Sequence, residues 1–501
     1  MPEAGTSIAE AAVRPVRGKP RRRARTAALW VTFALYATGS AAADLVFAPS
    51  KVDPEPRSFR FDPSSLSAPD AVNAVDPERL ASTLLTLLPL SSRSCRETDI
   101  AQSARDLLKE IGDPAGMQVQ LDRLPEMAAE LKPEMKAELY CDNGQTAPES
   151  GNVIAYLPGD PALPAWNLSF HLDTNQTRFD GIGRDGDVIR PGPGTPLGAD
   201  DKAGLAIIAE VLRVIRDLKL AHGDIRVVGL VAEEDTAVGA QLIDGSAFRG
   251  DFVVSADGTD PGEIGRAAPT TYGGYFTVRT QTSHPADVHE KKTVSACAVG
   301  ARILREAGFE AGAHPADHPD VVLHSYFSSC GIDEGAHTAK GHPAATFQYN
   351  TISPFWTAAW QLRSLEGVDG AKTMVDGIAA TLQRVCAEAE SGRTPVQCEI
   401  SGDNRPGLLG YVVPETAPAL LMLGTGFVRA GSGPVKITAR QFGGFNGNYI
   451  KERFDEEMVL IGTGADQIHT NQETVSVRGM ARVARGLLAG MLESYRFRLV
   501  E

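Results

Sequence analysis

The fold can be worked out from one stretch, Leu197-Gly198-Ala199-Asp200-Asp201-Lys202-Ala203-Gly204, in which two adjacent acids precede a long apolar helix predicted over 201–218. Aspartate is favoured at a helix start, where its carboxylate meets unpaired N–H groups and the positive end of the helix dipole. Asp201 is expected to take that structural role. Asp200 is then left as a candidate for chemistry at the start of the helix.

Short apolar runs alternate with helical patterns on both sides of this helix. Buried strands are predicted at 153–157 and 166–170 before it, and at 225–232 and 252–256 after it. Such alternation is typical of an α/β sheet covered by helices.

The pattern changes near residue 270 and changes back near residue 408. In between, a strand-helix-strand-strand-helix-strand order predicts a small α+β domain, so we expect a catalytic domain interrupted by an inserted lid domain. The strands expected in the insertion lie at 275–280, 344–352 and 396–400, and the helices at 294–307 and 374–389. The predicted boundaries are a linker over 44–75, a first catalytic part over 76–269, the insertion over 270–405 and a second catalytic part over 406–501.

The first 43 residues differ from the rest of the chain. Seven basic residues and no acid lie between Arg14 and Arg25, and an uncharged stretch then runs from Thr26 to its end in Ala41-Ala42-Ala43. A basic region, an apolar region and an A-x-A site are typical of an export signal. We therefore predict an exported protein, periplasmic or secreted. The alternatives are a retained membrane anchor, which alone would make the membrane a partner, and a mis-assigned start codon in a cytoplasmic protein.

Composition excludes several classes of protein. With 501 residues, 43% of them hydrophobic and 22% charged, the chain is globular and long enough for two or three domains. The 63 acids outnumber the 49 basic residues, and a net charge of −14 repels phosphate backbones, so no nucleic-acid partner is expected. Six cysteines are scattered without a C-x-x-C pair, and no disulfide is assigned.

Polar side chains follow the predicted strands at one edge of the sheet, where open α/β sheets place their sites. Carboxylates gathered there repel one another, and a divalent metal removes that penalty. Neutral imidazole and carboxylate are zinc ligands, although cobalt or manganese could use the same set. The side chains in question are His171 and Asp173 after the strand 166–170, Glu233 and Glu234 after 225–232, Asp257 after 252–256, and His469 after a strand near 458–461.

The spacing of these residues suggests roles for them. An aspartate two residues from a ligating histidine can hold its other ring nitrogen, so Asp173 is assigned to orient His171. Of the adjacent acids Glu233 and Glu234, one can bind metal while the other takes a proton from a bound water. Each feature also has a structural alternative: a solvated acidic turn at 233–235 and a surface-loop histidine at 469.

The order of these motifs resembles the metallopeptidase family that contains peptidase T, acetylornithine deacetylase, succinyl-diaminopimelate desuccinylase and glutamate-releasing carboxypeptidases. The resemblance covers residues 76–495, and the Gly-Ala-Asp-Asp-Lys-Ala-Gly block is similar to the peptidase T branch in particular. It implies an α/β, zinc-exopeptidase-like catalytic domain with a mixed central sheet, an inserted lid and dimerisation domain, and a homodimer. It also implies two zinc ions bridged by Asp200, one completed by His171 and Asp257 and the other by Glu234 and His469, with Glu233 as general base and a peptide bond between Asp200 and Asp201 that is often cis.

Substrate-binding residues are less clear from this resemblance. In Ser283-His284-Pro285, His284 is a candidate to reach the site of a neighbouring subunit, or is simply a loop histidine before proline. The family's Arg-Gly-Gly-Thr-Asp-Gly loop, which helps hold a substrate carboxylate, is here Phe442-Gly443-Gly444-Phe445-Asn446-Gly447. Arg440 and Asn446 are the remaining candidates, and the tripeptide preference of the branch is in doubt.

Three hypotheses for function follow. The first is a metal-dependent aminopeptidase that cleaves the N-terminal peptide bond of short peptides with a metal-bound hydroxide. The second keeps the chemistry and changes the substrate, giving an N-acyl amino acid deacylase or a carboxypeptidase. The third is an exported, catalytically silent peptide-binding protein.

Overall fold

A computed structural model of the chain describes residues 44–500, except 63, 65–68, 133–146, 175–179, 310–317, 333–344, 347, 434 and 441–442. The predicted export segment, 1–43, lies outside the described residues, and so does Phe442. Among the helices that the structure does describe, none is both long and apolar enough to cross a membrane.

The catalytic domain is built on an eight-stranded sheet with the order β17-β10-β18-β9-β5-β8-β4-β3. Its central strands β18, β9, β5 and β8 are parallel, whereas β3, β4 and β10 join antiparallel neighbours, so the sheet is mixed. Every residue of β5 is buried, as expected for a parallel strand covered on both faces. The strands are β3 (Gln118–Leu121), β4 (Val153–Leu157), β5 (Trp166–His171), β8 (Ile225–Leu230), β9 (Phe252–Gly258), β10 (Glu263–Gly265), β17 (Lys436–Thr438) and β18 (Val459–Gly462).

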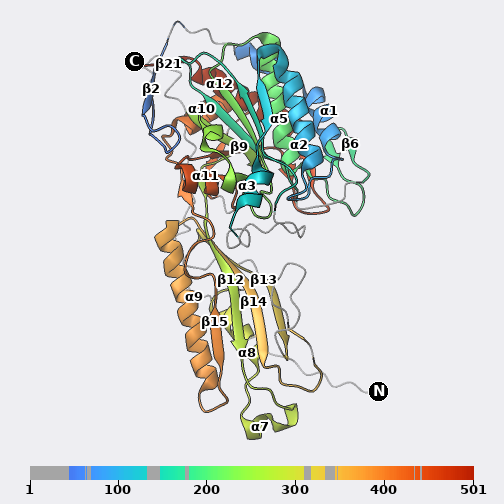
Figure 1. Cartoon of the computed structure of the whole chain (residues 1–501), viewed down its shortest axis with the longest axis vertical. Coiled ribbons are helices and arrows are strands. Elements are labelled where there is room, and N and C mark those ends of the chain that lie inside the picture. Colours follow the sequence, from blue (N-terminus) through green and yellow to red (C-terminus); the bar gives the residue numbers. More distant parts are fainter. Residues whose placement is uncertain are drawn as a thin grey trace, which may run out of the picture. The chain divides into compact units, whose positions relative to one another are not determined.

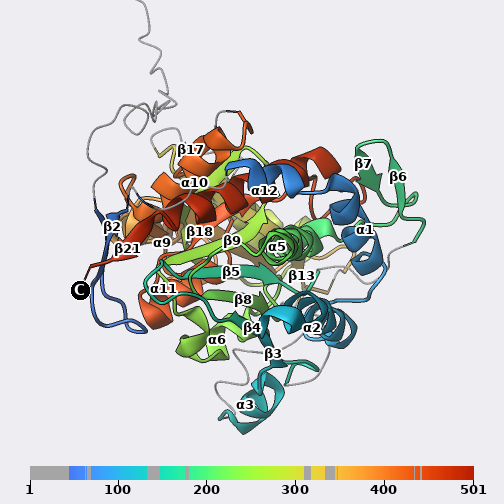
Figure 2. The same cartoon turned by 90° about the horizontal axis from the view of Figure 1, so that it is seen from above.

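Helix α5 (Ala199–Leu218) lies against β5 and β9, and three further helices pack on it. Figures 1 and 2 show α1, α2 and α5 gathered on one side of the strands. The other helices of this domain are α1 (Pro77–Leu87), α2 (Thr98–Gly112), α3 (Leu124–Glu130), α6 (Val238–Leu242), α10 (Pro418–Arg429), α11 (Asn446–Phe454) and α12 (Val477–Ser494). Two of its smaller sheets are β19 (Ala465–Asp466), β20 (Thr474–Ser476), β7 (Val188–Arg190) and β6 (Gly183–Asp185), and β11 (Ala267–Ala268) with β16 (Tyr411–Val412).

The inserted domain has its own four-stranded antiparallel sheet, ordered β13-β14-β12-β15, and its own hydrophobic core. Helices α8 and α9 pack against β12 and β14. The predicted α/β fold with an inserted α+β domain is therefore confirmed, although residues 345–346 and 348–352, part of an expected strand, contain only isolated bridges. The elements are β12 (Thr270–Arg279), α7 (Val288–Lys291), α8 (Ala296–Glu306), β13 (Val321–Gly331), β14 (Phe355–Ser364), α9 (Gly367–Glu390) and β15 (Gln397–Ile400).

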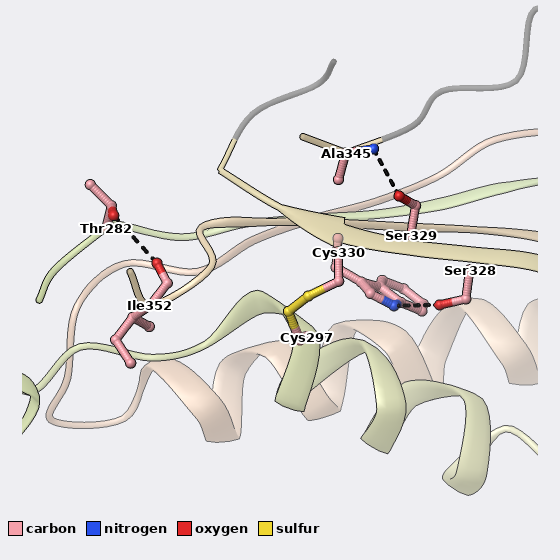
Figure 3. Close-up of a disulfide and its surroundings, with 8 residues drawn as sticks. Thr282, Cys297, Ser328, Ser329, Cys330, Ala345 and Ile352 are labelled. Carbon is pink, nitrogen blue, oxygen red and sulfur yellow. Dashed lines mark hydrogen bonds between the residues drawn. A yellow bond between two sulfur atoms is a disulfide. The ribbon is translucent and has the colours of Figure 1, made fainter. Parts of the chain in front are cut away.

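Two disulfides join helices to strands inside this domain. Cys297 of α8 is bonded to Cys330 of β13, with Cα atoms 5.7 Å apart, and Figure 3 shows this bond beside the Ser328 hydroxyl that accepts a hydrogen bond from the indole of Trp356. Cys386 of α9 is bonded to Cys398 of β15, with Cα atoms 6.4 Å apart. Both Cα separations lie in the normal range for a disulfide.

The stretch 44–75 differs from the predicted linker. It contains β1 (Leu45–Phe47), β2 (Arg57–Phe61) and a short 3-10 helix, Pro69–Ala74. Strand β2 pairs with β21 (Phe497–Leu499) at the other end of the chain, and Phe59 is completely buried. Strands β1 and β2 are only three and five residues long, and β2 pairs with a strand more than 400 residues away, so no local window of the sequence shows this pairing.

Candidate metal centre

The carboxyl ends of the four parallel strands meet at one edge of the sheet and deliver the predicted side chains there. His171 is the last residue of β5, and Asp257 lies near the end of β9. Glu233 and Glu234 follow β8, and His469 lies beyond β18, in the loop between β19 and β20. Asp200 reaches the same place from the start of α5, across a cis peptide bond to Asp201.

A first group of possible metal ligands consists of His171, Asp200 and Asp257. His171 Nε2 lies 3.3 Å from Asp200 Oδ1 and 3.4 Å from Asp257 Oδ1, and its side chain is 1% exposed. His171 Nδ1 lies 2.9 Å from the carbonyl oxygen of Asp173. Because a carbonyl oxygen can only accept, Nδ1 carries the proton and Nε2 is the nitrogen left to bind a cation.

A second group consists of Asp200, Glu234 and His469. His469 Nε2 lies 3.1 Å from Asp200 Oδ2 and 2.7 Å from Glu234 Oε1. Asp200 therefore offers one oxygen to each group, which is the arrangement of a bridging ligand. The His469 side chain is 45% exposed, so the second group lies at the open side of the site.

Asp173 connects this centre to the strand-end turn after β8. Its Oδ1 accepts a hydrogen bond from the backbone N–H of Glu233 at 2.9 Å, and its Oδ2 accepts from that of Glu234 at 3.0 Å. The hydroxyl of Ser94 donates to the same Oδ2 at 2.6 Å. Asp173 is completely buried, and its Oδ1 lies 3.3 Å from Nδ1 of His171. One carboxylate therefore contacts the backbone of Glu233, the backbone of Glu234 and the ring of His171.

Charge is concentrated at this edge of the sheet. Burial raises the pKa of Glu233 well above its ordinary value, and the charge of Asp257 adds to this effect. Burial also raises the pKa values of Glu234 and Asp257. Burial opposes the ionisation of Asp200, but hydrogen bonds from His171 and His469 outweigh it and lower the pKa of Asp200.

The donor set fits a pair of divalent cations. Ligand atoms around a tetrahedral zinc ion with bonds of about 2.0–2.1 Å lie ~3.3 Å from one another, which is close to the separations in the first group. Two imidazoles and three carboxylates are the ligand types that zinc takes, and cations offset the repulsion among the acids. Hydrogen bonds to Asp200 and Glu234 raise the pKa of His469 to about 10, so protons on the imidazoles screen the acids when no cation is bound.

A pocket of about 600 Å³ opens over the two groups. The side chain of Glu233, which belongs to neither group, lines it together with the ligand residues. The inserted domain contributes Thr271, Gln361 and Arg363, and Arg363 Nε donates to Gln361 Oε1 at 2.7 Å. Apolar side chains form another wall: Leu408, Phe445, Tyr449, Leu460 and Ile468.

Three residues predicted to bind substrate lie elsewhere in the structure. His284 lies in the inserted domain, where its Nδ1 accepts a hydrogen bond from the backbone N–H of Ala286 at 3.1 Å. Arg440 donates to the carbonyl oxygen of Pro319 at 3.1 Å. Asn446 is buried at the start of α11. None of the three lines the pocket described here, and a role for His284 in a second subunit stays a prediction.

Sequence reasoning missed several residues that hold the centre in place. The buried carboxylate of Glu97 accepts hydrogen bonds from the backbone N–H groups of Cys95 and Ala232, immediately before the two adjacent glutamates. The ammonium group of Lys202 donates to the carbonyl oxygens of Leu88 and Leu90. Glu473 accepts hydrogen bonds from the backbone of the segment that carries Asp200. Its position four residues after His469 was the one feature of the sequence that could have pointed to a role at the site.

Comparison with known proteins agrees with this geometry. The model of peptidase family M20/M25/M40 matches residues 168–493, which is more than half of the chain. The chain therefore belongs to this family of peptidases.

Individual relatives are distant or match over short segments. An uncharacterized protein, YqjE from Bacillus subtilis, is 26% identical over 235 residues, which make up 46% of this chain and 56% of that protein. Peptidase T of Escherichia coli is 43% identical over 70 residues, 14% of this chain and 17% of that enzyme. The chain thus matches about half the length of the first relative and about a sixth of the length of the second.

Solved structures are similar over a larger part of the chain. A tripeptidase from Staphylococcus aureus has a TM-score of 0.67 at 20% identity, covering 84% of this chain and 100% of that one. Aminopeptidase PepT from Bacillus cereus has a TM-score of 0.66 at 21% identity, covering 84% and 99%. At these identities the similarity establishes the fold.

Proposed function

We propose that the chain is a zinc-dependent aminopeptidase that hydrolyses the N-terminal peptide bond of short peptides such as tripeptides. One observation carries the proposal: two groups of ligands share Asp200, and the carboxylate of Glu233 lines the same pocket without belonging to either group. That arrangement separates residues that hold cations from a residue that can move a proton. The tripeptidase and aminopeptidase structures with this fold support the choice of substrate.

The ligand residues, Glu233 and Asp173 then have distinct tasks. His171, Asp200, Asp257, Glu234 and His469 would hold the cations, which when bound activate a water molecule and polarise the substrate carbonyl. The carboxylate of Glu233 takes a proton from the nucleophile and passes it to the leaving amine. Asp173 fixes the position of the Glu233 backbone relative to the His171 ring, because it contacts both.

A second candidate function is favoured by the position of Arg363. This guanidinium lies in the pocket wall on β14, and planar guanidinium groups bind carboxylates well. An N-acyl amino acid deacylase or a carboxypeptidase also has to recognise a free carboxylate close to the cleaved bond. The two candidates differ in whether the substrate must also have a free α-amino group.

Matched substrates test this difference. Zinc-loaded protein is assayed with a tripeptide, the same tripeptide N-acetylated, and the N-acetylated single amino acid. For an aminopeptidase, we expect hydrolysis of the free tripeptide with release of its first residue, and at least tenfold lower kcat/KM for the N-acetylated form. Preferential hydrolysis of either N-acetylated substrate would select the second candidate, and hydrolysis of none would remove both.

We also propose that the protein is exported and forms a homodimer through the inserted domain. The disulfides Cys297–Cys330 and Cys386–Cys398 support export, because disulfides persist mainly in oxidising compartments. N-terminal sequencing of the mature protein tests whether residues 1–43 are removed. Sedimentation equilibrium tests the dimer, and a monomer at micromolar concentration would contradict it.

A further inference from the structure

The side chain of Glu473 accepts hydrogen bonds from four consecutive backbone N–H groups. Its Oε2 accepts from Leu197 at 3.2 Å and from Gly198 at 2.7 Å, and its Oε1 accepts from Ala199 at 2.8 Å and from Asp200 at 3.1 Å. Glu473 is 1% exposed, so these contacts are shielded from water. It is not one of the ligand residues of either group.

The four N–H groups belong to residues 197–200, which lead into the helical part of α5. The backbone of Asp200 and Asp201 is not helical, and Asp201 caps the helix as the sequence predicts, because its Oδ1 accepts a hydrogen bond from the backbone N–H of Gly204 at 3.0 Å. These N–H groups lie before the cap and have no partner within the helix, and an unpaired backbone N–H is costly to bury. Glu473, which lies 273 residues after Asp200, accepts from all four groups and so fixes the backbone from which Asp200 projects.

Glu473 also lies at the end of the segment that carries His469. A compact turn joins the two residues, with the backbone N–H of Glu473 donating to the carbonyl of Thr470 and the Thr470 hydroxyl donating to the carbonyl of Gln467. Strand β20 begins immediately afterwards, at Thr474. One side chain therefore fastens the His469 segment to the Asp200 segment.

The two histidines are held in different ways. His171 is buried, and Asp173 contacts its Nδ1. His469 is 45% exposed and makes its contacts to Asp200 and Glu234 through Nε2, and within the described residues nothing contacts its Nδ1 as Asp173 contacts that of His171. The position of the His469 imidazole thus depends on its backbone segment, which Glu473 anchors.

We infer that Glu473 is a positioning residue for the cation held by Asp200, Glu234 and His469. It sets the distance between His469 Nε2 and Asp200 Oδ2, which is 3.1 Å, without touching the cation itself. This inference rests on the two-cation site of the proposed function. Residues that orient metal ligands typically change metal affinity by roughly 10- to 100-fold when replaced.

The test is a metal titration of the full chain, with Zn²⁺ competing against a chromophoric chelator. Glu473→Gln keeps the shape of the side chain but replaces one acceptor oxygen with a donor. We expect the weaker-binding equivalent of Zn²⁺ to lose roughly 10- to 100-fold in affinity, while the tighter one changes less than threefold. Two Zn²⁺ bound with wild-type affinities would overturn the inference.

Glu210→Gln is the matched control. Like Glu473, Glu210 is a buried carboxylate, but it lies on α5 and accepts hydrogen bonds from Arg79, away from the site. It should lower the unfolding temperature without changing either Zn²⁺ affinity. If both variants lose affinity in proportion to their loss of stability, Glu473 is merely structural and the inference fails. Glu473→Asp, which keeps the charge but reaches fewer N–H groups, takes the place of Glu473→Gln if the latter does not fold, with a smaller loss in the same equivalent expected.

A double-variant comparison isolates the route through His469. If Glu473 acts through that side chain, His469→Ala and the combined His469→Ala, Glu473→Gln protein should bind Zn²⁺ alike, because the effects of coupled residues do not add. Full additivity would contradict the inference. If the wild-type protein binds fewer than two Zn²⁺, the proposed two-cation site fails instead, which separates the two outcomes.

Discussion

The backbone N–H of Glu233 donates to Oδ1 of Asp173 at 2.9 Å, so the residue proposed as the base and the residue that orients His171 form one connected unit. Ser94 donates to the other oxygen of Asp173, from a loop more than 70 residues earlier. The segments that carry Ser94, Asp173 and Glu233 therefore have to be correctly placed against one another before the carboxylate of Glu233 lies in the pocket. This explains how an acid outside both ligand groups can keep a fixed position beside them.

Glu233→Gln should lower kcat by about 10²–10⁴-fold, the usual contribution of a general base, because the amide cannot take a proton. Bound zinc and the unfolding temperature should stay close to wild type, since Glu233 belongs to neither ligand group. Steady-state kinetics and metal analysis on the same preparation make the measurement. Glu263→Gln, which alters an acid paired with Lys436 at the protein surface, is the control and should keep full activity. Near wild-type turnover by Glu233→Gln would show that another group moves the proton.

Replacing His469 should remove one cation and leave the other. His469→Ala leaves the second group with two carboxylates, whereas the first group keeps His171, Asp200 and Asp257. The zinc content of the dialysed protein, measured by plasma mass spectrometry, should therefore fall from two ions per chain to one. His318→Ala, which changes a histidine paired with Glu366 in the inserted domain, should retain both. An unchanged ratio in His469→Ala would contradict its role as a ligand.

Glu456 should make stability depend on pH. Burial raises the pKa of its carboxyl to about 7, from 4.5. A carboxyl with a raised folded-state pKa stabilises the fold while protonated, and that contribution is lost as pH rises from about 4.5 through about 7. Glu456→Gln mimics the protonated form, so its stability relative to wild type should increase between pH 5 and pH 8. Urea unfolding at both pH values measures this, and a difference that does not change with pH would be evidence against it.

Removal of the disulfides should destabilise the inserted domain by unequal amounts. The Cys297–Cys330 bond spans 33 residues and the Cys386–Cys398 bond spans 12. Loop-closure entropy gives about 4 kcal/mol for the longer loop and about 3 kcal/mol for the shorter one. Urea unfolding of the two paired Cys→Ser variants should show the larger loss for the first pair. Equal stability of both variants and the wild type would mean that the bonds do not form in solution.

The sequence revealed those parts of the centre that stand next to a strand end or within a continuous motif. His171, Glu233, Glu234 and Asp257 follow buried apolar runs, and a run predicts both a strand and the edge at which it ends. The structure brings these residues together with Asp200 and His469, although their role as ligands stays a prediction.

The parts that could not be predicted depend on contacts between distant segments. Glu97 accepts from Ala232, and Phe59 lies in a strand whose partner is β21, so no local window contains either relationship. In the loop 442–447, where the family has an arginine that helps hold the substrate carboxylate, the sequence suggested Arg440 as a substitute because it lies two residues from Phe442. In the structure, Arg440 instead donates a hydrogen bond to the carbonyl oxygen of Pro319, and a different arginine, Arg363, lines the pocket.

Arg363→Ala should therefore impair substrates according to their carboxylate. The guanidinium lines the pocket on the inserted-domain side, and guanidinium groups bind carboxylates such as the free C-terminus of a short peptide. We expect kcat/KM for a tripeptide to fall about 10- to 100-fold, equivalent to the roughly 1.5–3 kcal/mol of a hydrogen bond to a charged group, with most of the change in KM. The same tripeptide with an amidated C-terminus should be a poor substrate for wild type and variant alike. Arg279→Ala is the control. Arg279 lies on the neighbouring strand β12 and is paired with Glu399, so this variant should keep the wild-type ratio of kcat/KM for the two substrates. An equal loss on the acid and the amide would show that Arg363 supports the pocket without recognising the carboxylate.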